Sequence, residues 1–153
     1  MHRTAIFSRC KKYRYVLTRK WNAELPPVLF VALNPSIADE TIDDPTVRRC
    51  VSFAREWGYG GILIANLFAF RSSDPRKLTS TDDPIGPRND WWLSRLSAES
   101  AITIAAWGTH GALSNRAVAV LPSLRNVHHL GLTRDGHPRH PLYLPGTTRP
   151  ALL

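Results

Sequence analysis

The sequence contains no apolar run long enough to cross a membrane. Its longest apolar stretches, "GILIA" at 61–65 and "AITIAAW" at 101–107, are far shorter than the ~18–20 residues that a membrane-spanning helix needs. The opening "MHRTAIFSRCKKYRYV" contains cations but not the apolar segment of a signal peptide. The sequence therefore predicts a cytoplasmic protein without a membrane partner.

Cysteine is scarce, with Cys10 and Cys50 the only two. Two cysteines so far apart, with no His or Asp set nearby, do not make a metal site. In a reducing compartment we expect both to be free thiols. No metal and no cofactor is predicted.

Acidic residues are few relative to basic ones. The chain has 20 Lys and Arg against 12 Asp and Glu, which gives a net charge of +8 and a pI of about 10.2. A pI above ~9 in one domain is typical of proteins that bind nucleic acid. The alternative is a solvated basic surface without a partner. The basic residues are spread along the chain, at 9–20, 48–55, 71–77, 88–95 and 134–149, which favours a broad phosphate-facing surface over a disordered tail.

The chain has no internal repeat and no low-complexity segment, and its 153 residues fit one domain, expected to be monomeric. We divide it into an N-terminal arm or strand at 1–27, a core at 28–145 and a tail at 146–153. Within the arm, "YRYVLTRKW" alternates well enough for a strand near an edge of a sheet.

Three apolar segments in the core are typical of strands buried on both faces: "VLFVAL", "GILIANLFAFR" and "AITIAAWG". A fourth strand is expected at "NVHHLGL". Helical patterns separate them. The first helix is expected after Asp44 as the N-cap and Pro45 at the first position, the second after Asn89 or Asp90 as the cap, and the third over "GALSNRAVAVLPS" with its end before Pro122. This alternation predicts an α/β fold with three layers, α/β/α, around a central, mostly parallel four-stranded sheet.

Ligands of such sheets bind at the carboxyl ends of the strands. Asn34 follows the first strand and Asn66 ends the second, where its amide could read the edge of a base. Each has a structural alternative: Asn34-Pro35 is a common start of a turn, and the Asn66 amide could bond a neighbouring loop. Trp107-Gly108 ends the third strand, as a core tryptophan and a turn glycine or as part of a site.

Beyond Gly108, Thr109 and His110 lie near the start of the third helix, where an anion is favoured. The tail "GHPRHPLYLP" contains two His-Pro pairs, at His137 and His140. A neutral imidazole donates one hydrogen bond and can stabilise developing negative charge. The alternative is an exposed loop with two unremarkable histidines.

Taken in order, these motifs resemble those of the uracil-DNA glycosylase superfamily, and most of all its mismatch-specific branch with an Asn-Pro motif. "ALNPS" matches the first motif with Asn34 at the Asp/Asn position, and "LIANLFAFR" matches the apolar run closed by Asn66. "AAWGTHG" matches the strand that ends in Trp-Gly, and "HPLYL" at 140–144 matches the His-Pro motif. The match covers about residues 28–145. The whole-chain pattern also resembles a family of uncharacterised bacterial and phage proteins, which indicates no function.

The resemblance implies a uracil-DNA-glycosylase-like fold and a monofunctional DNA glycosylase of base excision repair. Such an enzyme flips a damaged, deaminated or modified base from single- or double-stranded DNA. Asn34 would orient the water, with slower hydrolysis than an Asp at that position would give, and His140 would stabilise the departing base. The implied base-binding residues are Leu33, Ser36, Phe53, Asn66 and Phe68. The implied DNA contacts are Arg71, Thr109, Arg139, Tyr143 and Leu144, with Leu144 as the wedge that fills the vacated stack. His137 is the weaker candidate of the two tail histidines.

The sequence departs from the superfamily pattern at three motif positions, Ala32, Ser36 and Leu142, and "TIDDPT" at 41–46 has no counterpart. Asp43 and Asp44 therefore have two possible roles, one structural and the other in support of catalysis. Two other functions stay open: a non-catalytic protein of the same fold that binds DNA or bases, and an N-glycosidase that acts on free nucleosides or nucleotides.

Overall fold

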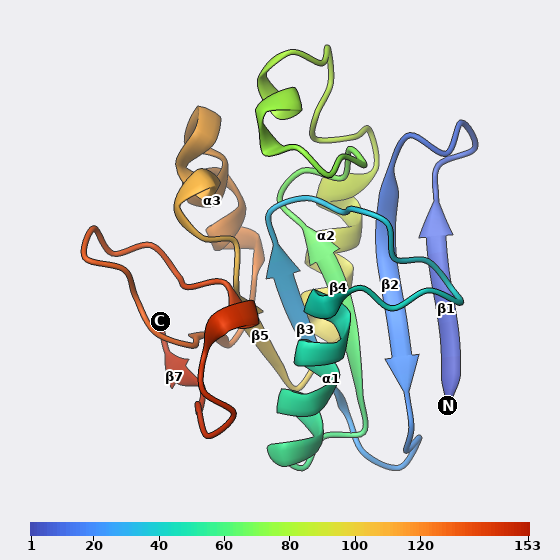
Figure 1. Cartoon of the computed structure of the whole chain (residues 1–153), viewed down its shortest axis with the longest axis vertical. Coiled ribbons are helices and arrows are strands. Elements are labelled where there is room, and N and C mark those ends of the chain that lie inside the picture. The colour runs from blue at the N-terminus through green and yellow to red at the C-terminus, as the bar shows by residue number, and fades with distance from the viewer.

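The computed structural model describes residues 1–153 as an α/β protein built on one sheet (Figure 1). The strands are β1 (His2–Phe7), β2 (Arg14–Lys20), β3 (Pro27–Ala32), β4 (Gly61–Asn66), β5 (Ile102–Ala105), β6 (Val127–His129) and β7 (Ala151–Leu152). The α-helices are α1 (Pro45–Glu56), α2 (Asn89–Glu99) and α3 (Arg116–Val120), and the 3-10 helices are η1 (Pro75–Thr79), η2 (Thr109–Asn115), η3 (Leu121–Ser123) and η4 (Pro141–Tyr143).

The sheet has seven strands in the order β1-β2-β4-β3-β5-β6-β7, so the expected four-stranded, mostly parallel sheet is wrong. The four strands predicted from apolar runs pair in parallel at its centre. Strands β1 and β2 on one side, and β7 on the other, add three antiparallel pairs. β2 is not an edge strand, because β1 covers its outer side. A pattern of apolar residues does not predict that β2 is buried, because two of its buried residues are arginines, Arg14 and Arg19.

Helices cover both faces of the sheet. On one face α1 contributes Val47, Cys50 and Phe53 to a core cluster with β3 and β4. On the other face α2 contributes Leu93 and Leu96 to a second cluster. Figure 1 shows α1 in front of the sheet and α2 behind it. This arrangement confirms the α/β class.

The start of α1 agrees with the sequence. The Asp44 carboxylate accepts a hydrogen bond from the Val47 N–H at 2.8 Å, and Pro45 is the first helical residue. Such a cap contributes about 1 kcal/mol. The predicted cap of α2 is wrong, because Arg88 stands at that position and neither Asn89 nor Asp90 caps the helix. The Asn89 amide instead donates to the backbone carbonyls of Asn66 and Leu67 at the end of β4.

The third predicted helix is mostly a 3-10 segment. Ser114 and Asn115 adopt left-handed backbone conformations, with φ of 53° and 56°, and this break separates η2 from the short α3. A left-handed non-glycine residue interrupts the helical hydrogen bonds, and the sequence pattern did not indicate it. α3 does end before Pro122, as expected.

No helix is both long enough and apolar enough to cross a membrane. Cys10 is exposed and Cys50 is buried, and both are free thiols, as predicted.

Candidate functional site

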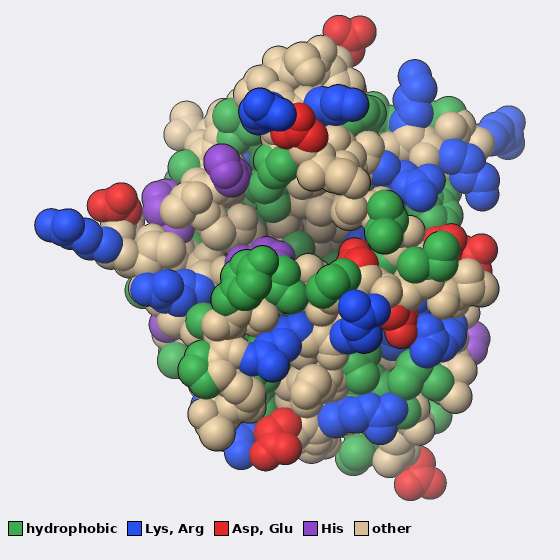
Figure 2. Space-filling view, in the orientation of Figure 1, with side chains coloured by type: hydrophobic (Ala, Val, Ile, Leu, Met, Phe, Trp, Pro, Cys, Tyr) green, Lys and Arg blue, Asp and Glu red, His purple; other side chains and the backbone are tan.

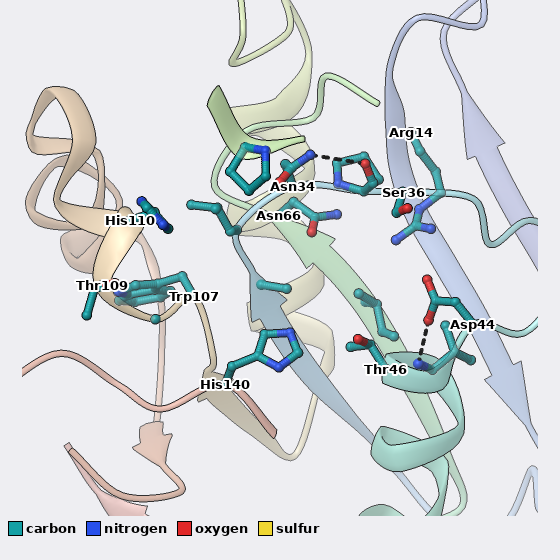
Figure 3. A pocket seen from close by; sticks show the side chains of 17 residues that line it. Arg14, Asn34, Ser36, Asp44, Thr46, Asn66, Trp107, Thr109, His110 and His140 are labelled. Carbon is teal, nitrogen blue, oxygen red and sulfur yellow. Dashed lines mark hydrogen bonds between the residues drawn. The ribbon is translucent and has the colours of Figure 1, made fainter. Parts of the chain in front are cut away.

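A cavity of about 370 Å³ opens at the carboxyl end of the parallel strands, above the start of α1 (Figure 3). Its size is within the range of small-molecule sites. Its polar lining consists of Arg14, Asn34, Ser36, Asp44, Thr46, Asn66, Thr109, His110 and His140. Leu33 and Trp107 are among the apolar residues that complete the wall. No group of three or more His, Cys, Asp or Glu side chains is placed to share a metal ion.

Asn34 and Asn66 meet in this cavity because of the register between β3 and β4. Ala32 lies directly opposite Asn66 in this parallel pair. Directly opposed residues point to the same face of a sheet, and so do residues two apart in one strand. Asn34 follows the end of β3 by two residues, and the two amides, 32 positions apart in the sequence, both line the cavity at these adjacent strand ends.

The Asn34 amide is held by the backbone. Its Nδ2 group donates to the carbonyl oxygens of Ser72 at 2.8 Å and Pro35 at 3.2 Å, with Phe70 at 3.5 Å. The Oδ1 atom has no hydrogen-bond partner in the protein. Asn34 can therefore accept a hydrogen bond from a water or ligand at Oδ1 while its orientation is fixed by Nδ2.

Asn66 presents an unused donor. The residue is 1% exposed, and its Nδ2 atom is buried without a hydrogen-bond partner. A buried unpaired donor costs about 1–3 kcal/mol, so native structures seldom contain one without a reason. Because Asn66 lines the cavity, a ligand that accepts a hydrogen bond there would satisfy it.

Two glycines allow the backbone after β5 to form one wall of the cavity. Gly108 has a φ of 70°, which favours glycine, and its N–H donates to the Pro138 carbonyl at 2.9 Å. Gly111 packs so closely on the Trp107 indole that an added Cβ would lie 2.0 Å from its Cδ1 atom. Trp107 is buried in the core cluster under α2, as the structural alternative expected, and it also lines the cavity.

His140 is the only tail histidine that reaches the cavity. Its Nδ1 atom accepts a hydrogen bond from the Leu142 N–H at 3.1 Å. Nδ1 is therefore unprotonated and the neutral ring carries its proton on Nε2. Partial desolvation lowers the pKa of His140 below its usual value, although the nearby Asp44 carboxylate opposes the shift. The side chain is thus a neutral Nε2–H donor near pH 7.

Arg14 brings a buried cation to the cavity wall. It reaches this end of the sheet because β2 runs antiparallel to β4, so its first residue lies near the last residues of β4. The side chain is 3% exposed; its Nη1 donates to the Ala38 carbonyl at 3.0 Å, while its Nε has no partner. Burial lowers the pKa of Arg14 to about 10, with Asp44 opposing, so the guanidinium is still charged at neutral pH.

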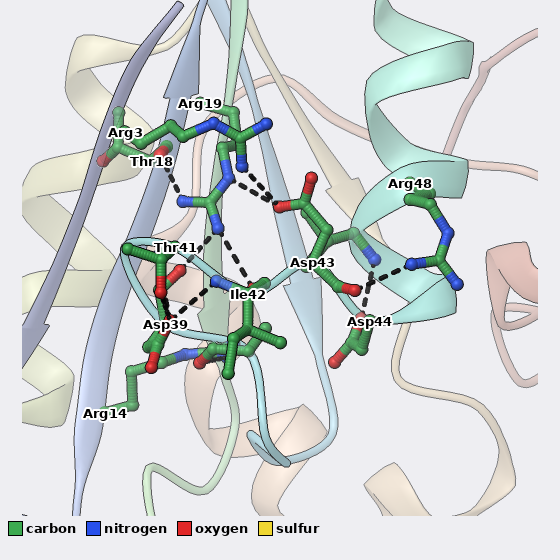
Figure 4. A network of polar contacts seen from close by, with 12 residues as sticks. Arg3, Arg14, Thr18, Arg19, Asp39, Thr41, Ile42, Asp43, Asp44 and Arg48 are labelled. Carbon is green, nitrogen blue, oxygen red and sulfur yellow. Dashed lines mark hydrogen bonds and ion pairs between the residues drawn. The ribbon is translucent and has the colours of Figure 1, made fainter.

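Asp44 lines the cavity beside Arg14, at the end of a loop that a second arginine anchors (Figure 4). Arg19 is fully buried and donates to the Asp43 carboxylate at 2.8 Å and to the carbonyls of Asp39 and Ile42. The Asp39 carboxylate in turn accepts from the Ile42 N–H at 2.7 Å. The buried Arg19 side chain therefore holds the loop before α1 in place, and Asp44 lies at the end of this loop.

Six of the twelve residues predicted for the site line the cavity: Leu33, Asn34, Ser36, Asn66, Thr109 and His140. Phe53 and Phe68 do not, because each is buried in the core, on opposite faces of the sheet. Leu144 is half-buried against the core cluster under α1, so it is not free to enter a duplex. Tyr143, in the same turn, is 91% exposed.

The two predicted DNA-binding arginines lie outside the cavity. Arg71 stacks on the Phe7 ring at 4.6 Å and donates to the Lys11 carbonyl, next to the β1–β2 turn. Arg139 is exposed and donates to the Leu132 carbonyl. Figure 2 shows Lys and Arg side chains gathered near the β1–β2 turn and scattered over the rest of this face. The basic surface is therefore broad and not a single patch.

The sequence patterns did not predict that Arg14 lines the cavity, and they indicated chiefly a helix cap for Asp44. No local signal marks Arg14, because its position depends on β2 pairing beside β4. Asp44 could have been found, because it stands at the start of the helix that follows Asn34, and such starts lie at the carboxyl edge of the sheet.

The fold and the cavity define an α/β protein with a polar cavity at the carboxyl ends of its parallel strands. The chain belongs to the family described as proteins of unknown function and designated DUF1643, whose sequence model matches residues 14–142. That range includes every polar residue of the cavity, from Arg14 to His140. No curated protein and no solved structure gives a significant match.

Proposed function

We propose that this protein is a DNA N-glycosylase related to the uracil-DNA glycosylase superfamily. It would release a flipped damaged, deaminated or modified base and leave an abasic site. The observation that carries the proposal is the convergence of Asn34, Asn66 and His140 on one cavity, because these are the three residues to which the motif resemblance assigns chemistry.

Each of the three side chains has a defined hydrogen-bonding state. Asn66 offers its unpaired Nδ2 to an acceptor on the edge of the base. His140 offers Nε2–H to the base as it departs with the electron pair of the broken N-glycosidic bond. A well-aimed donor to developing negative charge contributes about 3–4 kcal/mol. Asn34 accepts a hydrogen bond from the attacking water at Oδ1 and orients it.

The surroundings of the cavity suit DNA as a partner. The net charge of +8 and the broad basic face provide phosphate contacts. Leu144 was the predicted wedge, but Tyr143, predicted as a DNA contact, is the side chain that projects into solvent, so we assign the stacking role to Tyr143. A base that pairs poorly flips at the lowest cost, which favours damaged or mismatched substrates.

An abasic-site assay tests the proposal. Oligonucleotides that contain uracil, hypoxanthine, xanthine or a bulky modified base are incubated with the protein, and strand cleavage at abasic sites is measured after alkali. We expect release from at least one substrate, and loss of release in Asn34→Ala and His140→Ala. His137→Ala is the matched control, because His137 lies outside the cavity. No release from any substrate over long incubation would contradict the proposal, and oligonucleotide binding without release would favour a non-catalytic binder.

The buried guanidinium of Arg14 favours a second candidate, an N-glycosidase acting on free nucleotides. A cation inside a cavity suits the phosphate of a small substrate as well as a polar group of a base. Comparing base release from mononucleotides and from oligonucleotides decides between the two. A faster reaction on the mononucleotide would favour the second candidate.

A further inference from the structure

The cavity contains one carboxylate, that of Asp44. Its Oδ1 atom accepts the Val47 N–H at 2.8 Å, while Oδ2 has no hydrogen-bond partner in the protein. Figure 3 shows this side chain at the end of the cavity that also holds Arg14, facing the space bounded by Asn66 and His140. One oxygen therefore holds the helix, and the other is available to a ligand or a water.

The cavity is built to hold a polar ligand. Two donors on its wall, Arg14 Nε and Asn66 Nδ2, are buried without partners, and both side chains are more than nine-tenths buried. Such donors are satisfied only when a polar group enters the cavity. A water or substrate bound there would lie beside the Asp44 carboxylate.

Hydrolysis of an N-glycosidic bond is accelerated by a group that takes a proton from the attacking water. The amide of Asn34 cannot, because it is not a base at neutral pH and its Nδ2 group is already bound to carbonyl oxygens. No other Asp or Glu lines the cavity. Asn34, the motif residue that follows β3, therefore orients the water. A general base has to be supplied by another residue.

We infer that Asp44 is the general base of the reaction, an inference that rests on the proposed glycosylase function. As the N-glycosidic bond breaks, its electron pair leaves with the base, and the Nε2–H of His140 stabilises that base. The water oxygen held by Asn34 attacks the anomeric carbon, and its proton passes to Asp44 Oδ2. The negative carboxylate also favours the positive charge that grows on the sugar. The proton then returns to solvent, and the departed base takes up a proton.

The surroundings of Asp44 suit this role. Arg14 faces it from β2 and His140 from the turn at η4, while Cys50 lies one to two turns further along α1. In its own segment, Asp43 is turned away toward Arg19, and the Arg48 guanidinium donates to the Asp43 carbonyl at 2.8 Å. The cationic Arg14 lines the same cavity and places a positive charge near this carboxylate.

The decisive experiment compares Asp44→Asn with the wild type in the abasic-site assay. Asn and Asp cap a helix about equally well, so this change removes the charge and basicity but keeps the cap. We expect base release to fall about 10²–10⁴-fold, the usual contribution of a general base. We expect oligonucleotide affinity, measured by fluorescence anisotropy, and thermal stability to stay near those of the wild type.

Asp74→Asn is the matched control. Asp74 caps η1 by accepting the Arg76 N–H at 3.0 Å, and it lies outside the cavity, so the same chemical change there should leave base release unaltered. Asp44→Ser, which also supplies a cap without a carboxylate, guards against a folding defect specific to Asn. Wild-type rates of base release in both Asp44 variants would overturn this inference and leave the proposed function intact. No base release by the wild-type protein would overturn both.

Discussion

The side-chain amide of Asn34 donates a hydrogen bond to the backbone carbonyl of Ser72 at 2.8 Å, and so ties the end of β3 to the loop that follows β4. The same Nδ2 group faces the carbonyls of Pro35 and Phe70. Three carbonyl oxygens around one side-chain nitrogen require a donor at this position. The structure therefore explains why an amide, and not a carboxylate, stands here.

This environment predicts that Asn34→Asp does not increase base release, the activity that we propose. A carboxylate would place negative charge against three carbonyl oxygens and lose the bond to Ser72, which should lower the free energy of unfolding by about 1–3 kcal/mol. Base release should not rise above that of the wild type. Urea unfolding and the abasic-site assay measure the two effects. Asn126→Asp, at an exposed amide that donates to the single carbonyl of Ala101, is the control and should cost less. A faster, equally stable Asn34→Asp variant would disprove this explanation.

Replacing Arg14 should weaken ligand binding without lowering the stability of the fold. Arg14→Met removes a buried cation whose Nε has no partner, and an apolar side chain of similar length fills the same space. Such replacements of buried charges are often neutral or stabilising. We expect an equal or higher melting temperature together with weaker binding of oligonucleotide or mononucleotide. A marked fall in melting temperature with unchanged binding would instead show that Arg14 is purely structural.

The state of His140 can be followed by NMR. Partial desolvation lowers its pKa, so the ring should titrate below the usual histidine range and remain neutral, with the proton on Nε2, near pH 7. Because the Asp44 carboxylate opposes this shift, Asp44→Asn should lower the pKa of His140 further. Long-range ¹H–¹⁵N spectra of the imidazole across a pH series report both the titration and the tautomer. A proton on Nδ1 near pH 7 would contradict the hydrogen bond from Leu142.

The loop that carries Asp44 should contribute to acid sensitivity through Asp43. Desolvation raises the pKa of Asp43, but hydrogen bonds from Arg19 and Arg3 outweigh it and hold the pKa below its usual value. A lowered carboxyl pKa stabilises the fold above the unfolded-state value and loses that contribution as the pH falls through the folded-state value. Asp43→Asn should therefore lower stability by about 1–2 kcal/mol at pH 7. Urea unfolding at pH 7 and in acid should show the gap between variant and wild type closing in acid; a constant gap would contradict the ionic explanation.

The sequence by itself determined the parallel centre of the fold. The apolar runs that became β3, β4 and β5 are buried on both faces, and such burial requires nearly continuous apolar residues that a local pattern reveals. The start of α1 could be predicted for a similar reason. Asp44 and Pro45 act through hydrogen bonds and backbone angles within one turn. The placement of Asn34, Asn66 and His140 near one another followed from topology, because successive parallel strands end at the same edge.

Only the tertiary structure decided what surrounds these three residues. β2 pairs beside β4, and its buried arginines, Arg14 and Arg19, bond to partners more than 20 positions away, at Ala38 and Asp43. That pairing brings a cation into the cavity, and the Arg19 contacts hold the loop that precedes Asp44. Phe53 and Phe68, by contrast, turned inward to the core. Burial of charge and the direction of an aromatic ring are set by contacts between distant segments, so no local pattern of residues could reveal them.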